Sequence, residues 1–226
     1  MAISVDEQRV GAPTHAPHGR EIFWNLPNTI TVLRTAVIPV LLLLPVFSPA
    51  PADAPELASD LDKLGSQVIA WCFIVAAVTD IIDGWLARRG QQVTHIGKLL
   101  DPLADKLLVS TALVVLVAVE RIPMWAVWMV VVIIGREIAV TGLRSLASAG
   151  GRVMGASWLG KLKAVAQNIA IAALLFYYPT FWLPAKEIGL AMLTLATLLT
   201  LWSGYLYFAE YFRGLHADAP TEGSWT

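Results

Sequence analysis

Six long apolar segments, separated by short polar stretches, dominate the pattern of this chain. They cover about residues 28–48, 66–87, 101–119, 123–147, 160–179 and 187–211. A helix that crosses a bilayer needs about 20 mostly apolar residues, and each segment comes close to that length or exceeds it. Proline and glycine residues gather in the connections, where they end helices. The pattern therefore predicts an all-α integral membrane protein with six transmembrane helices.

Composition supports the membrane interpretation. Hydrophobic residues make up 57% of the 226 residues and charged residues only 15%, whereas a soluble domain carries about 25% charged residues. The single cysteine, Cys72, excludes a disulfide or a cysteine-based zinc site within one chain. The formal net charge of −1 gives no sign of nucleic-acid binding, and we expect no nucleic-acid partner.

The polar ends of the chain suggest a simple domain organisation. We expect residues 1–20 to form a disordered cytoplasmic tail, residues 21–213 a single membrane domain, and residues 214–226 a second cytoplasmic tail. An even number of spans places both termini on one side of the membrane. Only Lys63, Arg121 and Lys186, of the 16 Lys and Arg residues, fall in the segments that would face the other side. Because cytoplasmic segments are enriched in Lys and Arg, both termini are predicted to be cytoplasmic.

Four aspartates lie where the second and third apolar segments approach the cytoplasmic side. Asp80 and Asp83 are three residues apart, and Asp101 and Asp105 are four apart. Either spacing places two carboxylates on one face of a helix. Ionisable groups next to the membrane are costly and are functional candidates by default. Four carboxylates on adjacent antiparallel helices would repel unless a cation neutralised them, and such oxygen ligands suit Mg²⁺ or Mn²⁺. The sequence therefore predicts a divalent-metal site at the cytoplasmic surface.

The same stretch contains a longer motif. It reads Asp80, two residues, Asp83-Gly84, two residues, Ala87-Arg88, eight residues, Gly97, three residues, Asp101, three residues, Asp105. This pattern resembles the signature of the CDP-alcohol phosphatidyltransferase family in every fixed position. The resemblance implies a six-span enzyme, usually a homodimer in the cell membrane, with its active site facing the cytoplasm. In this family the hydroxyl group of an alcohol attacks a CDP-linked phosphate, and CMP leaves.

The resemblance also implies roles for individual residues. Asp80, Asp83 and Asp101 would bind one or two divalent ions, and Asp105 would be the general base and a further metal ligand. A second set would bind the nucleotide: Asn28, Thr31, Asp80, Gly84, Ala87 and Arg88.

Three further blocks bear on the acceptor alcohol. Asn28, Thr31 and Arg34 recur every three residues along the first apolar segment, the fourth contains Gly-Arg-Glu-Ile from Gly135, and the fifth opens with Leu-Gly-Lys-Leu-Lys from Leu159. Together they resemble the branch of the family that joins CDP-diacylglycerol to sn-glycerol 3-phosphate to give phosphatidylglycerophosphate. A phosphorylated acceptor needs cationic partners. The candidates for this role are Arg34, Arg136, Arg144, Lys161 and Lys163.

Other readings of these residues remain open at this point. Arg136 and Glu137 would also fit an internal ion pair, and Lys161 and Lys163 would fit ordinary cytoplasmic charge. A phosphatidylinositol phosphate synthase, or another CDP-alcohol phosphatidyltransferase, would share the signature but normally lacks the second and third blocks. A cation transporter would place its carboxylates near the middle of the bilayer and often shows inverted repeats, which this sequence does not.

Overall fold

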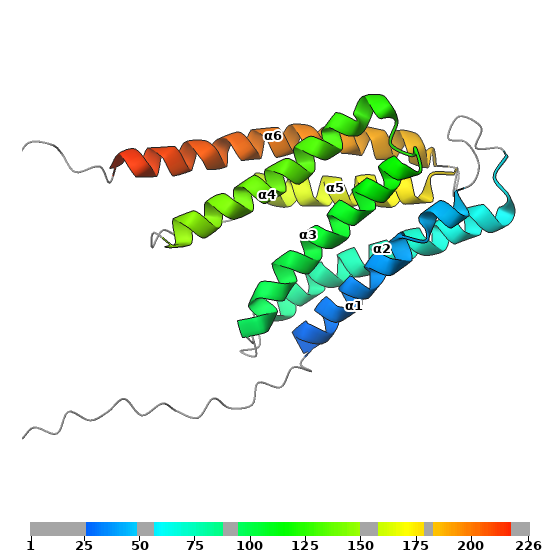
Figure 1. The fold of residues 1–226 in the computed structure, drawn as a ribbon, viewed down its shortest axis with the longest axis horizontal. Coiled ribbons are helices and arrows are strands. Elements are labelled where there is room, and N and C mark those ends of the chain that lie inside the picture. Colours follow the sequence, from blue (N-terminus) through cyan, green and yellow to red (C-terminus); the bar gives the residue numbers. More distant parts are fainter. Residues whose placement is uncertain (1–25, 49–56, 88–94, 150–157, 179–182, 218–226) are drawn as a thin grey trace, which may run out of the picture.

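The structure, a computed structural model, describes residues 26–48, 57–87, 95–149, 158–178 and 183–217; for 26–30, 80–87, 95–102 and 214–217 it describes the backbone alone. The predicted tails at 1–20 and 218–226 lie outside these ranges. The described residues form six α-helices and two short 3₁₀ helices (Figure 1). Their bounds are α1 Leu26–Leu41, η1 Leu44–Phe47, α2 Asp60–Ala87, α3 His95–Ala118, η3 Met124–Ala126, α4 Val127–Ala149, α5 Trp158–Phe176 and α6 Ala185–Ala217.

The six α-helices run back and forth between two ends of the molecule (Figure 1). At one end α1, α3 and α5 begin and α2, α4 and α6 finish. We call it the signature end, because the last turns of α2 and the first turns of α3 carry the four aspartates. The helices converge toward the opposite end and spread apart toward the signature end, where α3 stands away from α4 and α6 (Figure 1).

Four segments in the described part of the chain are long and apolar enough to cross a membrane. They are Asp60–Thr79, Met124–Ala149, Trp158–Phe176 and Ala185–Arg213. A shorter apolar helix covers Thr31–Leu41. Large hydrophobic side chains lie exposed along these helices, including Val131, Leu198 and Trp202, as expected for surfaces that face lipid. The all-helical prediction and the membrane character are therefore confirmed at this level.

The first helix is shorter than the predicted segment 28–48. It ends at Leu41, and the chain continues through a turn into η1. Pro45 lies in the first turn of η1, where its missing N–H costs nothing. Within a continuous α-helix the same proline would remove a hydrogen bond and clash with the preceding turn. Pro39 is nevertheless accommodated inside α1.

The second and third helices begin earlier than their apolar segments, at Asp60 and His95. A capping box explains the start of α2. The backbone N–H of Asp62 donates to Ser59 Oγ at 3.2 Å, and the backbone N–H of Ser59 donates to Asp62 Oδ2 at 2.9 Å. These two bonds satisfy amides that would otherwise lack partners at a helix start. At the other end of the chain, α6 continues to Ala217, four residues into the predicted tail.

The helices pack as two groups of three. In the first group α1 packs against both α2 and α3, which have little contact with each other among the described residues, although their sequences predicted adjacent antiparallel helices. In the second group α6 packs closely on α5 and also on α4, and the contact between α2 and α5 joins the groups. Phe73, Leu113, Ile133 and Leu174 belong to one continuous buried cluster across both groups. Close approach of α5 and α6 depends on Gly189, because a Cβ atom there would lie 2.6 Å from Leu174 Cγ.

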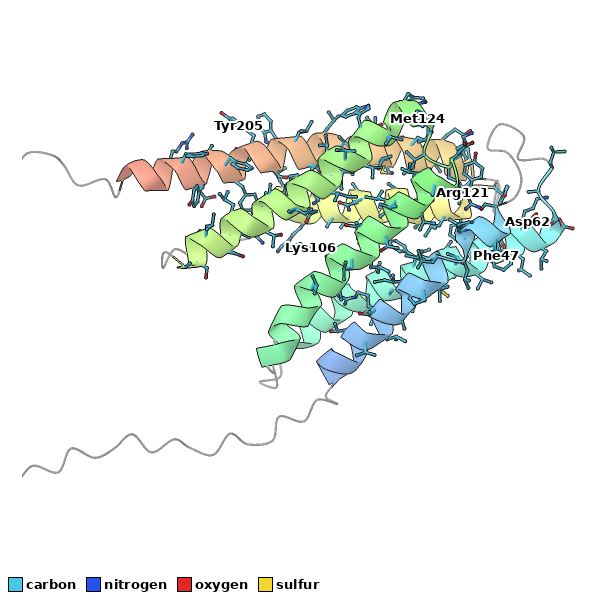
Figure 2. The ribbon with its side chains drawn as sticks, in the orientation of Figure 1. Phe47, Asp62, Lys106, Arg121, Met124 and Tyr205 are labelled. Atoms are coloured by element: carbon cyan, nitrogen blue, oxygen red, sulfur yellow. The ribbon has the colours of Figure 1, made fainter. Side chains whose placement is uncertain are left out.

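Arg121 holds the opposite end together (Figure 2). It lies between α3 and η3 and is only 1% exposed. Its guanidinium donates to the backbone oxygen of Leu175 at 2.6 Å and to the hydroxyl groups of Ser48 and Ser66. Tyr177 places its ring 5.0 Å from the Arg121 Cζ atom. This one buried cation therefore links the residue after η1, α2 and the end of α5. Its hydrogen bonds help to hold the helices together where they converge.

Candidate functional site

The signature aspartates occupy helix ends that lie at the same end of the molecule. Asp80 and Asp83 are in the last two turns of α2, and Asp101 and Asp105 are in the first turns of α3. Of the four, only Asp105 has a described side chain, which is half-buried. Among described side chains no group of three or more His, Cys, Asp or Glu is placed to hold a metal ion. The predicted metal site also needs the side chains of Asp80, Asp83 and Asp101, which the structure does not describe. The metal site therefore stays a prediction.

A polar cavity of about 790 Å³ opens beside Asp105. Its walls come from α3, α4, α5 and α6, so it occupies the region where α3 stands apart from the other helices. The charged residues that line it are Asp105, Lys106, Arg136, Glu137, Arg144, Lys161 and Lys163. A smaller cavity of about 340 Å³ shares five of them and extends between α3, α4 and α5. Cations outnumber carboxylates on these walls, which favours an anionic ligand.

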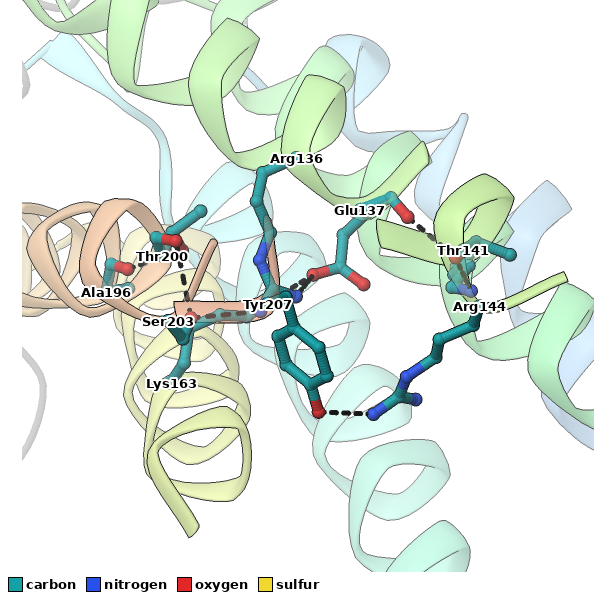
Figure 3. Close-up of polar contacts among 10 residues, drawn as sticks. Arg136, Glu137, Thr141, Arg144, Lys163, Ala196, Thr200, Ser203 and Tyr207 are labelled. Atoms are coloured by element: carbon teal, nitrogen blue, oxygen red, sulfur yellow. Dashed lines mark hydrogen bonds and ion pairs between the residues drawn. The ribbon is translucent and has the colours of Figure 1, made fainter. Parts of the chain in front are cut away.

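We call Arg136, Arg144, Lys161 and Lys163 the cationic wall of this cavity. Glu137 is the carboxylate that pairs with two of these cations (Figure 3). Its Oε1 atom accepts a hydrogen bond from Lys163 Nζ and lies 3.3 Å from Arg136 Nη1. The side chain of Lys163 is only 5% exposed, and a charge so deeply buried needs a partner of opposite sign. Glu137 therefore offsets part of the cost of burying the positive charges of Lys163 and Arg136. The internal ion pair considered for Arg136 and Glu137 does form, and both of its members line the cavity.

Lys106 enters the cavity from α3, where it follows Asp105 directly. Its Nζ atom donates to the hydroxyl group of Thr141 on α4. The Thr141 hydroxyl in turn donates to the backbone oxygen of Glu137 at 2.6 Å. This chain of hydrogen bonds links α3 to α4 across the space where few other contacts join them.

Arg144 and Arg136 both lie against Tyr207 of α6 (Figure 3). Arg144 Nη2 donates to the Tyr207 hydroxyl oxygen, and Arg136 Nη2 donates to Ser203 Oγ at 3.0 Å. Arg136 Nε is buried and has no hydrogen-bond partner among the described residues. This nitrogen is enclosed next to Gly204 of α6, where an added Cβ atom would lie 3.7 Å from it.

The residues predicted on the first helix lie apart from this wall. Thr31 and Arg34 are buried on α1, at 4% and 3% exposure. Arg34 lines a separate, mainly apolar cavity of about 400 Å³ between α1 and α2. The structure therefore brings together Arg136, Arg144, Lys161 and Lys163 but not Arg34. Asn28, Gly84 and Ala87 have helical backbones without described side chains, and Arg88 lies outside the described residues.

Three cavity residues with notable contacts, Lys106, Glu137 and Tyr207, were not among the predicted site residues. Lys106 follows the signature directly, where a cation that only balances the charge of the aspartates is the simplest interpretation. Glu137 lies inside the Gly-Arg-Glu-Ile block, and its ion pair with Arg136 was considered, but its contact with Lys163 was not predicted. Tyr207 gave no signal, because an aromatic residue near the end of an apolar segment is usually an interface anchor.

Comparisons with known proteins agree with the signature. The family model for CDP-alcohol phosphatidyltransferase matches residues 24–202. The chain is also similar to CDP-diacylglycerol–glycerol-3-phosphate 3-phosphatidyltransferases of several bacteria. It is 42% identical to that of Bacillus subtilis (strain 168), over 85% of this chain and 97% of the relative. It is 40% identical to that of Pseudomonas fluorescens, over 88% and 95%.

A third relative, from Escherichia coli (strain K12), carries the same name and is 38% identical, over 86% of this chain and 97% of its own length. The match of the family model covers well over half of the chain and includes all four signature aspartates. The chain belongs to the CDP-alcohol phosphatidyltransferase family.

Proposed function

We propose that this enzyme transfers a phosphatidyl group from CDP-diacylglycerol to sn-glycerol 3-phosphate, giving phosphatidylglycerophosphate and CMP. The observation that carries the proposal is the cationic wall beside Asp105, where Arg136, Arg144, Lys161 and Lys163 line one cavity. A wall of this kind suits an acceptor that carries a phosphate dianion, because guanidinium and ammonium groups form the strongest hydrogen bonds with phosphate oxygens. The names of the relatives point to the same donor and acceptor.

Arg136 supports this assignment of the acceptor. Its side chain is 12% exposed, and its buried Nε atom has no partner in the described part of the chain. Its Nη1 and Nη2 atoms already contact Glu137 and Ser203. Because a guanidinium carries five N–H donors, the Nη atoms keep further N–H groups that can donate to an incoming phosphate oxygen, whereas the enclosed Nε atom cannot. A neutral acceptor would use these donors less well.

The reaction would proceed at the boundary between the cationic wall and α3. The acceptor hydroxyl oxygen attacks the phosphorus atom that bears the diacylglycerol, the bond from this phosphorus to the CMP oxygen breaks, and CMP leaves with the bonding electrons. Asp105 accepts the hydroxyl proton, because it is the carboxylate that lines the cavity from α3. The cationic wall orients the acceptor and excludes less charged alcohols.

The four carboxylates fit one or two Mg²⁺ or Mn²⁺ ions in their chemistry. They provide only oxygen donors, which these hard cations prefer, and they lie in pairs at neighbouring helix ends. Asp80, Asp83 and Asp101, with Asp105 as a further ligand, would hold the ions. When bound, the ions would neutralise charge on the pyrophosphate and on the departing CMP. Asn28, Thr31, Asp80, Gly84, Ala87 and Arg88 would line the nucleotide site.

Six spans with the signature end facing the cytoplasm complete the proposal. The six α-helices run back and forth between the two ends (Figure 1), and the uneven distribution of Lys and Arg favours a cytoplasmic signature end. Donor lipid would then arrive from the inner leaflet and the polar acceptor from the cytosol. The localisation is the cell membrane, and the expected assembly is a homodimer.

The deciding experiment measures CMP release by the purified protein in detergent. CDP-diacylglycerol and Mg²⁺ or Mn²⁺ are supplied with one acceptor at a time: glycerol 3-phosphate, inositol phosphate, serine or phosphatidylglycerol. We expect release with glycerol 3-phosphate alone, and loss of release when EDTA removes the metal. Release only with inositol phosphate would keep the family chemistry and replace the acceptor. No release with any alcohol from folded protein would overturn the proposed reaction.

A further inference from the structure

Tyr207 is exceptional among the aromatic residues of α6. It is 4% exposed, whereas Tyr205, two residues before it, is 67% exposed. An aromatic residue near the end of an apolar helix is usually an interface anchor, but a buried side chain cannot serve that purpose. Tyr207 lines the polar cavity instead. It also lies beyond residue 202, where the match to the family model ends.

The ring of Tyr207 contacts two guanidinium groups at once (Figure 3). The Cζ atoms of Arg136 and Arg144 lie 5.4 Å and 4.9 Å from the ring centre. Its hydroxyl oxygen accepts a hydrogen bond from Arg144. Two arginines held close together repel each other, and the negative face of an aromatic ring offsets part of this repulsion. The tyrosine thereby permits a concentration of positive charge that would otherwise spread apart.

The preceding turn of α6 holds Arg136 from the other side. Ser203 accepts a hydrogen bond from Arg136 Nη2 and donates its own to the backbone oxygen of Thr200 at 3.3 Å. Gly204 leaves room for the arginine stem, because a Cβ atom there would lie 3.3 Å from Arg136 Cγ. Ser203, Gly204 and Tyr207 lie three and four residues apart and so share one face of the helix.

We propose that Ser203, Gly204 and Tyr207 of α6 are positioning residues that fix Arg136 and Arg144 in the geometry that binds the acceptor phosphate. This inference rests on the proposed function. Free arginine side chains lose much rotational freedom when they bind a ligand, and a site that has already ordered them binds more tightly. The specificity for a phosphorylated acceptor therefore depends on α6, a helix that carries neither the signature nor the acceptor blocks.

The test compares steady-state kinetics of Tyr207→Phe, Tyr207→Leu and the wild type, with each substrate varied in turn. Removal of the hydroxyl should raise the KM for glycerol 3-phosphate about fivefold, because one charge-assisted hydrogen bond is lost. Removal of the ring should raise it about twentyfold or more, because the contact with both cations is lost as well. The KM for CDP-diacylglycerol should stay within about twofold in both variants, since the residues proposed to recognise the donor lie on or next to α1, α2 and α3.

Tyr205→Leu is the matched control, because it removes an exposed tyrosine from the same turn of α6; it should leave both KM values unchanged. Gly204→Ala crowds Arg136 without changing Tyr207, and it should raise the KM for glycerol 3-phosphate but not the KM for CDP-diacylglycerol. This variant tests the inference if Tyr207→Leu does not fold. Unchanged KM for glycerol 3-phosphate in Tyr207→Phe and Gly204→Ala would overturn the inference, as would an equal rise for both substrates. Failure of the wild type to use glycerol 3-phosphate would instead refute the proposed function.

Discussion

Asp105 is the residue at which the two halves of the site meet. It belongs to the signature on α3, and it lines both the larger polar cavity and the smaller one beside it. Its neighbour Lys106 contacts α4 through Thr141. A carboxylate in this position is within the cavity that would receive the acceptor hydroxyl, and its charge is opposite to that of most of the wall.

Replacement of Asp105 by Asn should separate binding from turnover. The amide keeps the size of the side chain but cannot accept a proton, so kcat should fall about 10²- to 10⁴-fold, the usual contribution of a general base. Binding of CDP-diacylglycerol, measured by isothermal titration in the presence of metal, should weaken much less than kcat falls. Turnover within about tenfold of the wild type would remove Asp105 from the role of base.

Individual residues differ in how far sequence could place them. Arg136, Arg144, Lys161 and Lys163 were predicted as a group, because blocks of charge in apolar segments have few explanations, and they do line one cavity. Arg34 is also a charged residue in an apolar segment, but it lines another cavity. Helical spacing tells which face of a helix carries a residue, but not which other helix that face contacts. Tyr207 was missed because burial of an aromatic side chain depends on the neighbouring helices, which the sequence does not show.

At the scale of elements, the six apolar segments correspond to α1 to α6, and the errors lie at their ends. The capping box at Ser59 explains the early start of α2, and it lies in polar sequence that a search for apolar runs ignores. Pro39 is tolerated within α1, whereas the chain near Pro45 changes to η1. Two prolines of one apolar segment therefore lie in different structures. Pro39 lies inside α1, whereas Pro45 lies in the first turn of η1, which packs against α2.

The close contact between α5 and α6 should be sensitive to one methyl group. In Gly189→Ala the new Cβ atom would meet Leu174 Cγ at 2.6 Å and the Leu174 backbone nitrogen at 3.1 Å. Because a backbone atom cannot rotate away, the helices must separate, at a cost of about 1–3 kcal/mol. Thermal unfolding in detergent should show a lower midpoint.

Gly142→Ala on α4 is the control for this change, because a Cβ atom there has no neighbour within 4 Å. The gain in helix propensity, up to about 1 kcal/mol, should leave its midpoint unchanged or slightly higher. Equal midpoints for Gly189→Ala and the wild type would show that α5 and α6 are less tightly packed than the structure indicates.

At the scale of the whole molecule, the two ends should lie on opposite sides of the membrane. Single cysteines introduced into a Cys72→Ala background can test this with a maleimide that does not cross membranes. Met124, 85% exposed at the opposite end, should react as cysteine in right-side-out vesicles. Ser148, exposed near the end of α4, should react as cysteine only in inverted vesicles. The reverse pattern would place the signature end outside the cell.

The separation of α3 from α4, α5 and α6 at the signature end has an evolutionary consequence. The signature residues belong to α2 and α3, whereas the cations proposed to bind the acceptor phosphate belong to α4 and α5 and are held by α6. Because Arg121 joins the two groups at the far end, the acceptor-binding half can diverge without disturbing the reaction centre. A lineage would thus acquire a new head-group alcohol by drift in the second half of the gene, and hybrids joined between α3 and α4 should inherit acceptor choice from their second parent.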